Sequence, residues 1–261
     1  MLLDTHAHYD DEAFDADRDI LLENLKEYGI RKVINAGASV ESSYTGLKLA
    51  ERYPWVYAAL GAHPNYVEEL NETVLRDFAA LGAHPKVVAI GEIGLEYHYE
   101  EPLRDTQKIW FRRQLDLAAE TGLPVIIHSR EAAQDTFDEM QRAAARGIGG
   151  VIHCFSSGAE LARRYTELGF YIGIGGVVTF KNGKKMKEVA AAVPLSSIVL
   201  ETDSPYLAPE PNRGKRNDSR NLTRIAEEIA RLRGISAEEV QCVTEENALR
   251  CFPKLANEEV G

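Results

Sequence analysis

The sequence of 261 residues has few cysteines and no long apolar run. Its three cysteines, Cys154, Cys242 and Cys251, form no CxxC pair, which argues against a disulfide framework and is typical of reduced thiols in a cytoplasmic protein. No run of about 18 apolar residues occurs, so we expect no membrane-spanning helix. No charged leader with an apolar segment opens the chain, and we therefore expect no secretory signal.

Basic residues are also fewer than acidic ones. There are 30 Lys and Arg against 41 Asp and Glu, which gives a formal charge of −11 and argues against a general nucleic-acid coat protein. A small phosphate-bearing substrate is still compatible with this charge, because a bound metal ion can supply positive charge locally. The apolar content of 44% is sufficient for a large core.

Short apolar segments alternate with longer amphipathic ones along the whole chain. Several short segments are almost continuously apolar, as parallel strands buried on both faces are. The expected strands span residues 2–6, 32–37, 56–62, 87–93, 124–129, 150–154, 170–175 and 197–202. Between them, amphipathic patterns such as 222–232 predict helices, and Gly29, Gly122 and Gly169 fall where helix C-caps are needed.

This alternation predicts an α/β fold, a single-domain (β/α)8 TIM barrel over residues 1–261. An open doubly wound sheet is the main alternative, because it shows the same alternation of strands and helices. No low-complexity stretch or linker interrupts the pattern, which favours one domain over two. We expect a last helix, near residues 236–251, to pack outside the barrel.

Side chains able to bind a metal ion follow five of the expected strands. They are His6 and His8 at the first strand, then Glu92, His128, His153 and Asp203. His6 and His8 are two residues apart on a strand, so they project to the same face and can hold one ion together. The C-terminal ends of barrel strands meet at one mouth, where barrel enzymes have their active sites. The sequence therefore predicts a metal centre at this mouth.

A single histidine of this kind is more often a hydrogen-bonded core residue, and it is the recurrence at several strand ends that indicates a metal. Six candidate ligands exceed the four of a tetrahedral site, so we expect two divalent ions bridged by Glu92. Imidazole and carboxylate ligands are compatible with Zn, Mn, Fe, Ni or Mg, and the ligand set does not select among them.

Seven motifs in this order make the sequence resemble the TatD family of metal-dependent deoxyribonucleases, within the amidohydrolase superfamily. The motifs are "DTHAH" (4–8), "GAHP" (61–64), "GEIGLEY" (91–97), "HSR" (128–130), "HCFS" (153–156), "ETDSPYLAP" (201–209) and "NRGKRN" (212–217). The resemblance covers nearly the whole chain. It implies that one ion is held by His6, His8, Glu92 and Asp203, and the other by Glu92, His128 and His153.

Asp203 and Glu92 are the expected catalytic residues. Water bound to such ions ionises near neutral pH, and we predict that Asp203 accepts its proton during attack on phosphorus. Glu201, on the same strand, either orients the site or is an interior carboxylate paired with a basic residue. Cys154 follows His153, and strand alternation is expected to turn it away from the site as a buried structural thiol.

Four residues are candidate substrate contacts. His63 resembles the family's substrate-contacting histidine, and a loop histidine bonded to backbone is the alternative. Arg130 either binds a phosphate or pairs with a neighbouring acid such as Glu131. Arg213 and Lys215 lie in a basic segment after the eighth strand, where barrels commonly bind phosphate.

These features predict a hydrolase acting on ester bonds, namely a cytoplasmic metal-dependent phosphodiesterase that trims single-stranded DNA ends as a 3′–5′ exonuclease. The alternatives are a D-aminoacyl-tRNA deacylase, which resembles the same family, and a small-molecule amidohydrolase or lactonase. A non-catalytic scaffold is disfavoured, because a pseudoenzyme is expected to lose at least one ligand. DNA ends, or another phosphate-bearing substrate, are the expected partners. The sequence does not indicate the oligomeric state, and a monomer is compatible with it.

The chain departs from the usual family motifs at three places near the rim. Glu96 stands in "GLEY" where Asp is common, and Ser157 stands in "HCFSS" where Gly is common. Asp218 and Ser219 stand in "RNDS" where a Glu-Pro pair is common. We therefore expect the metal chemistry to be retained and the substrate specificity to be the property most open to change.

Overall fold

Eight parallel strands form a barrel in the structure, a computed structural model that describes residues 1–256. The strands are β1 (Leu2–Ala7), β2 (Ile30–Ala36), β3 (Val56–Leu60), β4 (Val87–Glu96), β5 (Val125–Arg130), β6 (Gly150–Ile152), β7 (Tyr171–Ile174) and β8 (Ile198–Leu200). Each strand pairs with the next one in chain order. A bridge between Ala7 and Ser204 joins the first strand to the segment after the last, and the amide of Asp203 donates to the carbonyl of His6 at 2.9 Å. The predicted (β/α)8 barrel is confirmed.

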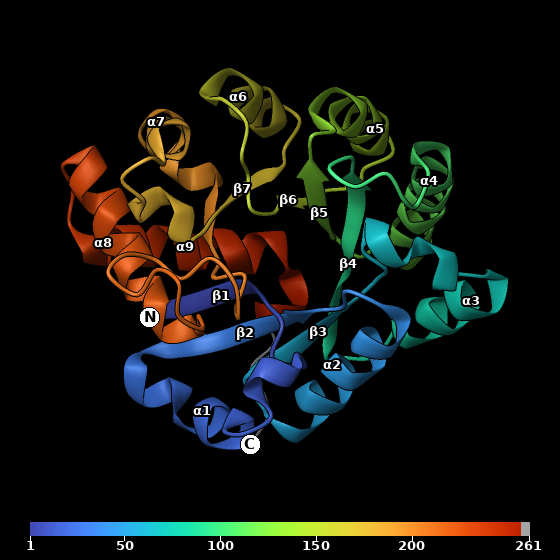
Figure 1. Cartoon of the computed structure of the whole chain (residues 1–261), viewed down its shortest axis with the longest axis horizontal. Helices are drawn as coiled ribbons and strands as arrows, with labels where there is room; N and C mark the ends of the chain where they lie inside the picture. Colours follow the sequence, from blue (N-terminus) through green and yellow to red (C-terminus); the bar gives the residue numbers. More distant parts are fainter. Residues whose placement is uncertain (257–261) are drawn as a thin grey trace.

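Helices surround this barrel (Figure 1). They are α1 (Arg18–Asn24), α2 (Val40–Arg52), α3 (Glu72–Leu81), α4 (Arg104–Thr121), α5 (Ala133–Ala145), α6 (Ala159–Glu167), α7 (Lys184–Ala192), α8 (Leu222–Arg233) and α9 (Ala237–Cys251). Short 3-10 turns lie in the connections: η1 (Glu12–Phe14), η2 (Leu25–Tyr28), η3 (Pro64–Glu69), η4 (Gly176–Thr179), η5 (Leu195–Ser197), η6 (Ser219–Asn221) and η7 (Pro253–Ala256). Within residues 1–256, none of these helices is both long and apolar enough to cross a membrane.

All eight expected strands exist, but β3, β6, β7 and β8 are shorter than predicted, and β4 extends further, to Glu96. β6 and β8 each end just before the polar residues of their motifs, because the backbone leaves the extended conformation there. Cys154 and Asp203 adopt positive φ angles of 42° and 58°. The connections after these strands, rather than the strands themselves, therefore direct the polar side chains into the mouth.

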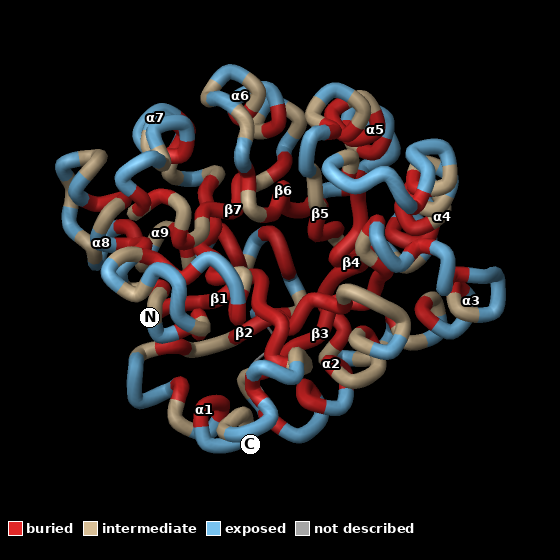
Figure 2. Tube along the Cα trace, in the orientation of Figure 1, coloured by how far each residue is buried: buried red, intermediate tan, exposed pale blue. Residues whose placement is uncertain are grey.

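The core consists of two layers. Strand residues are buried, and residues on the outer faces of the helices are exposed (Figure 2). The larger cluster packs outward-pointing strand side chains, such as Ile127 and Ile152, against the helices. The second cluster contains Ile126, Val151 and Val199, each two residues before a polar residue of the mouth. Because side chains alternate along a strand, these residues point into the barrel, beneath the candidate site.

The packing of the last helix differs from the expectation. α9 lies at the predicted position, but it does not pack entirely outside the barrel. Its end and η7 contribute Cys251, Phe252 and Leu255 to the cluster of inward-pointing strand side chains. These apolar residues close the end of the barrel opposite the mouth and leave the mouth as its open end. The predicted domain of residues 1–261 extends over residues 257–261, which lie outside the described residues.

Candidate metal centre

The six predicted ligands converge at the C-terminal mouth of the barrel. The mouth holds a cavity of about 830 Å³, and a separate cavity of about 550 Å³ lies elsewhere on the barrel. Five of the ligands line the mouth cavity: His8, Glu92, His128, His153 and Asp203. The sixth, His6, is fully buried beneath them. The residues come from β1, β4 and β5 and from the segments directly after β1, β6 and β8.

Four side chains face one point at the bottom of this cavity. The Nε2 atom of His6 lies 3.0 Å from Nε2 of His8 and 3.4 Å from Oε2 of Glu92. Oδ1 of Asp203 lies 3.7 Å from His6 Nε2 and 3.6 Å from His8 Nε2. Ligands bound about 2.1 Å from one ion lie roughly 3.0–3.4 Å apart, close to these separations. Nδ1 of His8 lies 2.9 Å from the carbonyl of Ala36, which orients Nε2 toward the shared point.

The other oxygen of Glu92 faces a second set of imidazoles. Its Oε1 lies 2.9 Å from Nδ1 of His128, 3.8 Å from Nε2 of His153 and 3.9 Å from Nε2 of His63. Glu92 thus lies between two groups of nitrogen atoms, with one oxygen directed to each. This arrangement is the one expected of a bridging carboxylate.

His63 is closer to the ligands than its predicted role as a substrate contact requires. It lies with Glu92 and His128 in one group whose donor atoms are all within 4.8 Å of one another. Burial lowers the pKa of His63 to about 4, so its imidazole is neutral near pH 7 and able to donate a lone pair. The structure therefore allows His63 to contact either a metal ion or a substrate group next to it.

The electrostatics of the cluster are those of a cation site. Burial opposes protonation of His8, but the Asp203 carboxylate, 3.6 Å away, and the charge of Glu92 raise the pKa of His8 to about 9. Burial also opposes ionisation of Glu92, yet His6 and the other imidazoles hold the pKa of that carboxyl well below its usual range. Ionised carboxylates are thus concentrated among buried imidazoles. A divalent ion would supply the positive charge that protonated imidazoles supply in its absence.

Glu201 is a positioning residue for the cluster. It is fully buried, and its Oε1 lies 3.2 Å from Nδ1 of His153 and accepts a 2.6 Å hydrogen bond from the amide of Cys154. Its negative charge overcomes the effect of burial on His153 and raises the pKa of that imidazole to about 10. A Cβ on Gly173 would overlap the Glu201 carboxylate, so the glycine of "GIGG" makes room for it. Of the two roles expected for Glu201, the structure agrees with the one in which Glu201 orients the site.

Glu96, where the family usually has Asp, is buried beside His128. Its Oε2 lies 3.2 Å from Nε2 of His128 and 3.7 Å from Nη1 of Arg130. The longer side chain of Glu96 therefore reaches Nε2 of the His128 imidazole, while Nδ1 of the same ring faces Glu92. Arg130 is half-exposed and lines the mouth cavity, as expected of a residue that meets a substrate.

The expectation that Cys154 turns away from the site is wrong. β6 ends before His153, so strand alternation no longer applies at Cys154, and the thiol lines the same cavity as His153. Within residues 1–256, the non-glycine residues with positive φ all lie in segments that follow a strand at the mouth: Glu131, Cys154, Asp203 and Leu207. Strained backbone of this kind gathers at functional sites, which agrees with a site at this mouth.

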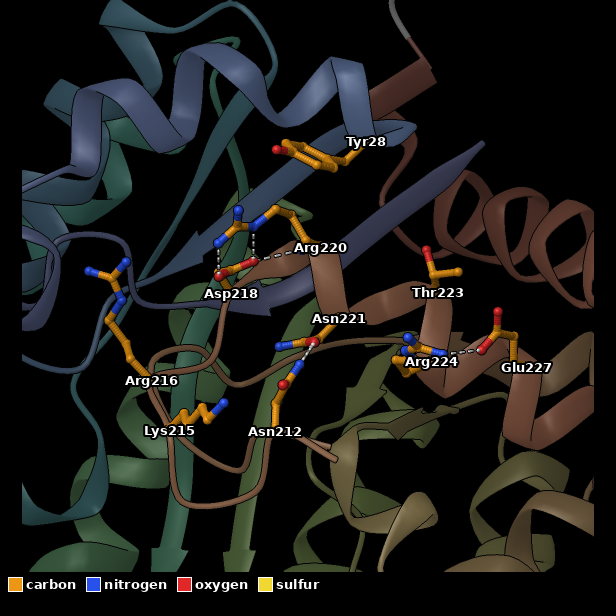
Figure 3. Close-up of a pocket in the computed structure, with 10 residues that line it drawn as sticks. All are labelled: Tyr28, Asn212, Lys215, Arg216, Asp218, Arg220, Asn221, Thr223, Arg224 and Glu227. Atoms are coloured by element: carbon orange, nitrogen blue, oxygen red, sulfur yellow. Dashed lines mark hydrogen bonds and ion pairs between the residues drawn. The ribbon is translucent and has the colours of Figure 1, made fainter. Parts of the chain in front are cut away.

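The basic segment after β8 lies partly away from the mouth. Lys215 lines the separate cavity of about 550 Å³, together with Arg216, Arg220 and Arg224 (Figure 3). Among the described residues, none lines both cavities. Arg213 lines neither of them, and its guanidinium lies 4.2 Å from the centre of the Phe180 ring. The structure therefore does not bring these two predicted substrate contacts to the candidate metal centre.

Asp218 and Ser219, which replace the usual Glu-Pro pair, have structural partners. Asp218 accepts a hydrogen bond of 2.8 Å from Nε of Arg220 (Figure 3). Ser219 donates its hydroxyl to the buried Asp4 at 2.6 Å and its amide to the hydroxyl of Tyr9 at 2.9 Å. Proline has no amide hydrogen, so the second bond requires a residue other than proline. These residues connect η6 to the first strand.

Comparisons with known proteins agree with this geometry. The family model described as "TatD related DNase" matches residues 3–253. The chain belongs to this TatD family. A Bacillus subtilis relative named "Uncharacterized metal-dependent hydrolase YabD" is 41% identical, with 97% of this chain and 99% of the relative covered. An Escherichia coli relative with the same description, YcfH, is 35% identical, with 97% and 96% covered.

Solved structures of TatD-family proteins have the same fold. The crystal structure of YjjV, a TatD homologue from Escherichia coli, superposes with a TM-score of 0.90 at 34% identity and covers 97% of this chain and 98% of its own. A TatD-family hydrolase from Entamoeba histolytica has a TM-score of 0.86 at 22% identity, with 96% and 97% covered, and shows the shared fold. The TatD-family chain thus has the barrel and the clustered ligands of a metal-dependent hydrolase.

Proposed function

We propose that the protein is a metal-dependent phosphodiesterase that removes nucleotides from the 3′ ends of single-stranded DNA. The observation that carries the proposal is the position of Glu92, with one oxygen directed to His6 and His8 and the other to His128. Such a bridging carboxylate suits a pair of divalent ions, which clamp both sides of an in-line displacement at phosphorus. The description of the family model as a DNase, and of relatives as metal-dependent hydrolases, supports the same class.

His6, His8, Glu92 and Asp203 would hold one ion, and Glu92, His128 and His153 the other. Divalent ions held there supply Lewis acidity, which lowers the pKa of water and stabilises charge on phosphoryl oxygens. Zn, Mn, Fe, Ni and Mg are each compatible with nitrogen and oxygen donors of this kind.

Asp203 is the proton acceptor of the proposed reaction. Burial opposes its ionisation, but the His8 imidazole, 3.6 Å away, lowers the pKa of Asp203 below its usual range, so the carboxylate is ionised at neutral pH. It takes a proton from the attacking water as the new bond from oxygen to phosphorus forms. The bond between phosphorus and the 3′ oxygen of the preceding nucleotide breaks, and Asp203 passes the proton it has taken up to that oxygen.

Arg130 and His63 would position the substrate, since both line the mouth cavity beside the ligands. Arg130 has the fork of donors that suits a phosphate. For Arg213 and Lys215, a substrate role requires a strand that extends beyond the mouth. As part of this proposal, we place the protein in the cytoplasm, as expected from the sequence. The three free cysteines agree with this location.

The test uses protein freed of metal with a chelator and then supplied with Mg²⁺, Mn²⁺ or Zn²⁺. The substrate is single-stranded DNA labelled at its 5′ end, and Asp203→Asn protein is the control. We expect a metal-dependent ladder that shortens from the 3′ end and is absent with the variant. If metal binds and the DNA stays intact, the phosphodiesterase proposal is wrong, and D-aminoacyl-tRNA and simple esters become the substrates to test.

A further inference from the structure

Three tyrosines stand exposed around the mouth cavity. Tyr66 in η3, Tyr99 after β4 and Tyr206 after β8 expose 46%, 52% and 54% of their surfaces, and all three line the cavity that holds the candidate ligands. They come from three different connections of the barrel, which meet at the mouth. Leu207, 39% exposed in a strained positive-φ conformation, adds an apolar side chain to the same rim.

The rings of Tyr99 and Tyr206 are held next to the groups of the site. The Tyr206 ring lies edge-on to His8 at 6.3 Å between centroids, and its hydroxyl donates to Asp11 at 3.0 Å. The guanidinium of Arg130 lies 5.7 Å from the centre of the Tyr99 ring. One tyrosine therefore adjoins the first candidate ion position, and the other adjoins the only Arg or Lys that lines the mouth within the described residues.

Charge alone does not explain binding of nucleic acid at this mouth. The acidic residues of its lining are Asp10, Asp11, Glu92, Glu96 and Asp203, against one arginine. Even with two divalent ions in place, little positive charge remains for phosphates beyond the one attacked. We therefore expect uncharged surfaces to add affinity for a nucleic-acid substrate, and exposed aromatic rings bind unpaired bases by stacking.

We propose that Tyr99 and Tyr206, with Tyr66 beside them, form a stacking rim that binds the unpaired nucleobases next to the attacked phosphate. This inference rests on the proposed function and deepens it, since it assigns the preference for single strands to named residues. Bases of a duplex end are stacked and paired with each other, so their faces are not available to the rim. The rim therefore selects unpaired ends without reading sequence, because every base has a face that can stack.

The test compares metal-loaded wild-type protein with Tyr99→Leu and Tyr206→Leu variants, and with Tyr99→Phe and Tyr206→Phe variants that keep the ring. Tyr28→Leu is the matched control, because Tyr28 is 50% exposed but lines the other cavity. Stacking on one ring corresponds to a change in affinity of about tenfold. We expect each leucine variant to raise KM for single-stranded DNA about tenfold with kcat little changed, and the phenylalanine and control variants to stay near wild type.

A second substrate, with abasic residues at its three-prime end, separates stacking from general disturbance of the mouth. With no base to stack on, wild-type and leucine variants should bind it alike. Equal effects on both substrates, or no effect on the normal one, would overturn the stacking rim. Binding of labelled single-stranded and duplex oligonucleotides to metal-loaded protein that is otherwise wild type, with and without each leucine change, tests the rim if DNA is not hydrolysed. The stacking rim and the phosphodiesterase proposal can therefore fail separately.

Discussion

At the scale of single residues, Glu201 is a buried carboxylate that is placed to orient a candidate metal ligand. It lies 3.2 Å from Nδ1 of His153 and leaves Nε2 of that ring directed toward Glu92 and Asp203. Partners of this kind fix the orientation of an imidazole and raise its basicity. Gly173 is required beside it, because any larger side chain would meet the carboxylate.

We predict that Glu201→Gln lowers metal affinity about 10- to 100-fold, because a neutral amide raises the basicity of the ligating imidazole less than a carboxylate does. Competition against a chromophoric chelator measures this affinity, and Glu160→Gln, a change at an exposed carboxylate of α6, is the control. Unchanged metal affinity in Glu201→Gln would contradict the positioning role.

The candidate ligands could be predicted from the sequence because all except Glu92, which lies inside β4, are at or close to the C-terminal end of a strand, where the fold itself brings side chains together. The role of Glu201 could not be decided, since it depends on space that a neighbouring strand provides at Gly173. Lys215 was expected near the substrate because it follows β8 in a basic segment. A basic segment does not show which way its side chains point, and the structure directs Lys215 to another cavity.

At the scale of elements, the connection after β8 is tied to the first strand and to the segment that follows it. Arg216 forms two hydrogen bonds of 2.6 and 2.7 Å with Asp17, between η1 and α1. Asn217 donates to the carbonyls of Thr202 and Tyr206, both at 2.8 Å. These contacts hold the loop that carries Asp203 and one tyrosine of the rim.

The contact between Asp17 and Arg216 should depend on pH. The hydrogen bonds from Arg216 hold the pKa of Asp17 below its usual value of 3.8. A lowered folded-state pKa means that the stabilisation is present above the unfolded-state pKa and is lost as the pH falls through the folded-state value. Because both side chains are partly exposed, we expect a coupling of at most about 1 kcal/mol.

A double-mutant cycle with Asp17→Asn and Arg216→Gln, measured by urea unfolding, reports this coupling. We expect it at pH 7 and expect a smaller value near pH 3. A coupling that is as large or larger at the lower pH would show that the charge of Asp17 is not its source.

The existence of every strand could be predicted because each is a short apolar run between amphipathic segments. The ends of β6 and β8 could not, since a pattern of alternating side chains gives no sign that Cys154 and Asp203 adopt positive φ. The position of the last helix was predicted correctly, but its contact with the barrel interior was missed. An apolar pattern at Phe252 and Leu255 shows that these residues are buried, but not against which partner.

At the scale of the whole molecule, the closed end of the barrel is apolar and the open end carries buried, ionisable groups. The apolar core is extensive, so we expect the protein to remain folded without metal. Metal binding to the folded state should still stabilise it, because the assembled cluster does not exist in the unfolded chain.

At a metal concentration 100 times the dissociation constant, the stabilisation is about 2.7 kcal/mol, which corresponds to a rise in Tm of roughly 5–10 °C for a chain of this size. Calorimetry of chelator-treated protein with added Mn²⁺ or Zn²⁺ measures the change. A His6→Ala, His8→Ala double variant serves as the control and should show a much smaller rise. If the variant responds as the wild type does, the stabilising ion binds elsewhere.

The central claim, a metal centre bridged by Glu92, is tested most directly by anomalous X-ray diffraction from crystals grown with Mn²⁺. We predict one peak among His6, His8, Glu92 and Asp203, and a second beside the other oxygen of Glu92, near His128 and His153. Absence of both peaks in crystals of protein that binds Mn²⁺ in solution, or peaks only outside the mouth, would contradict the account.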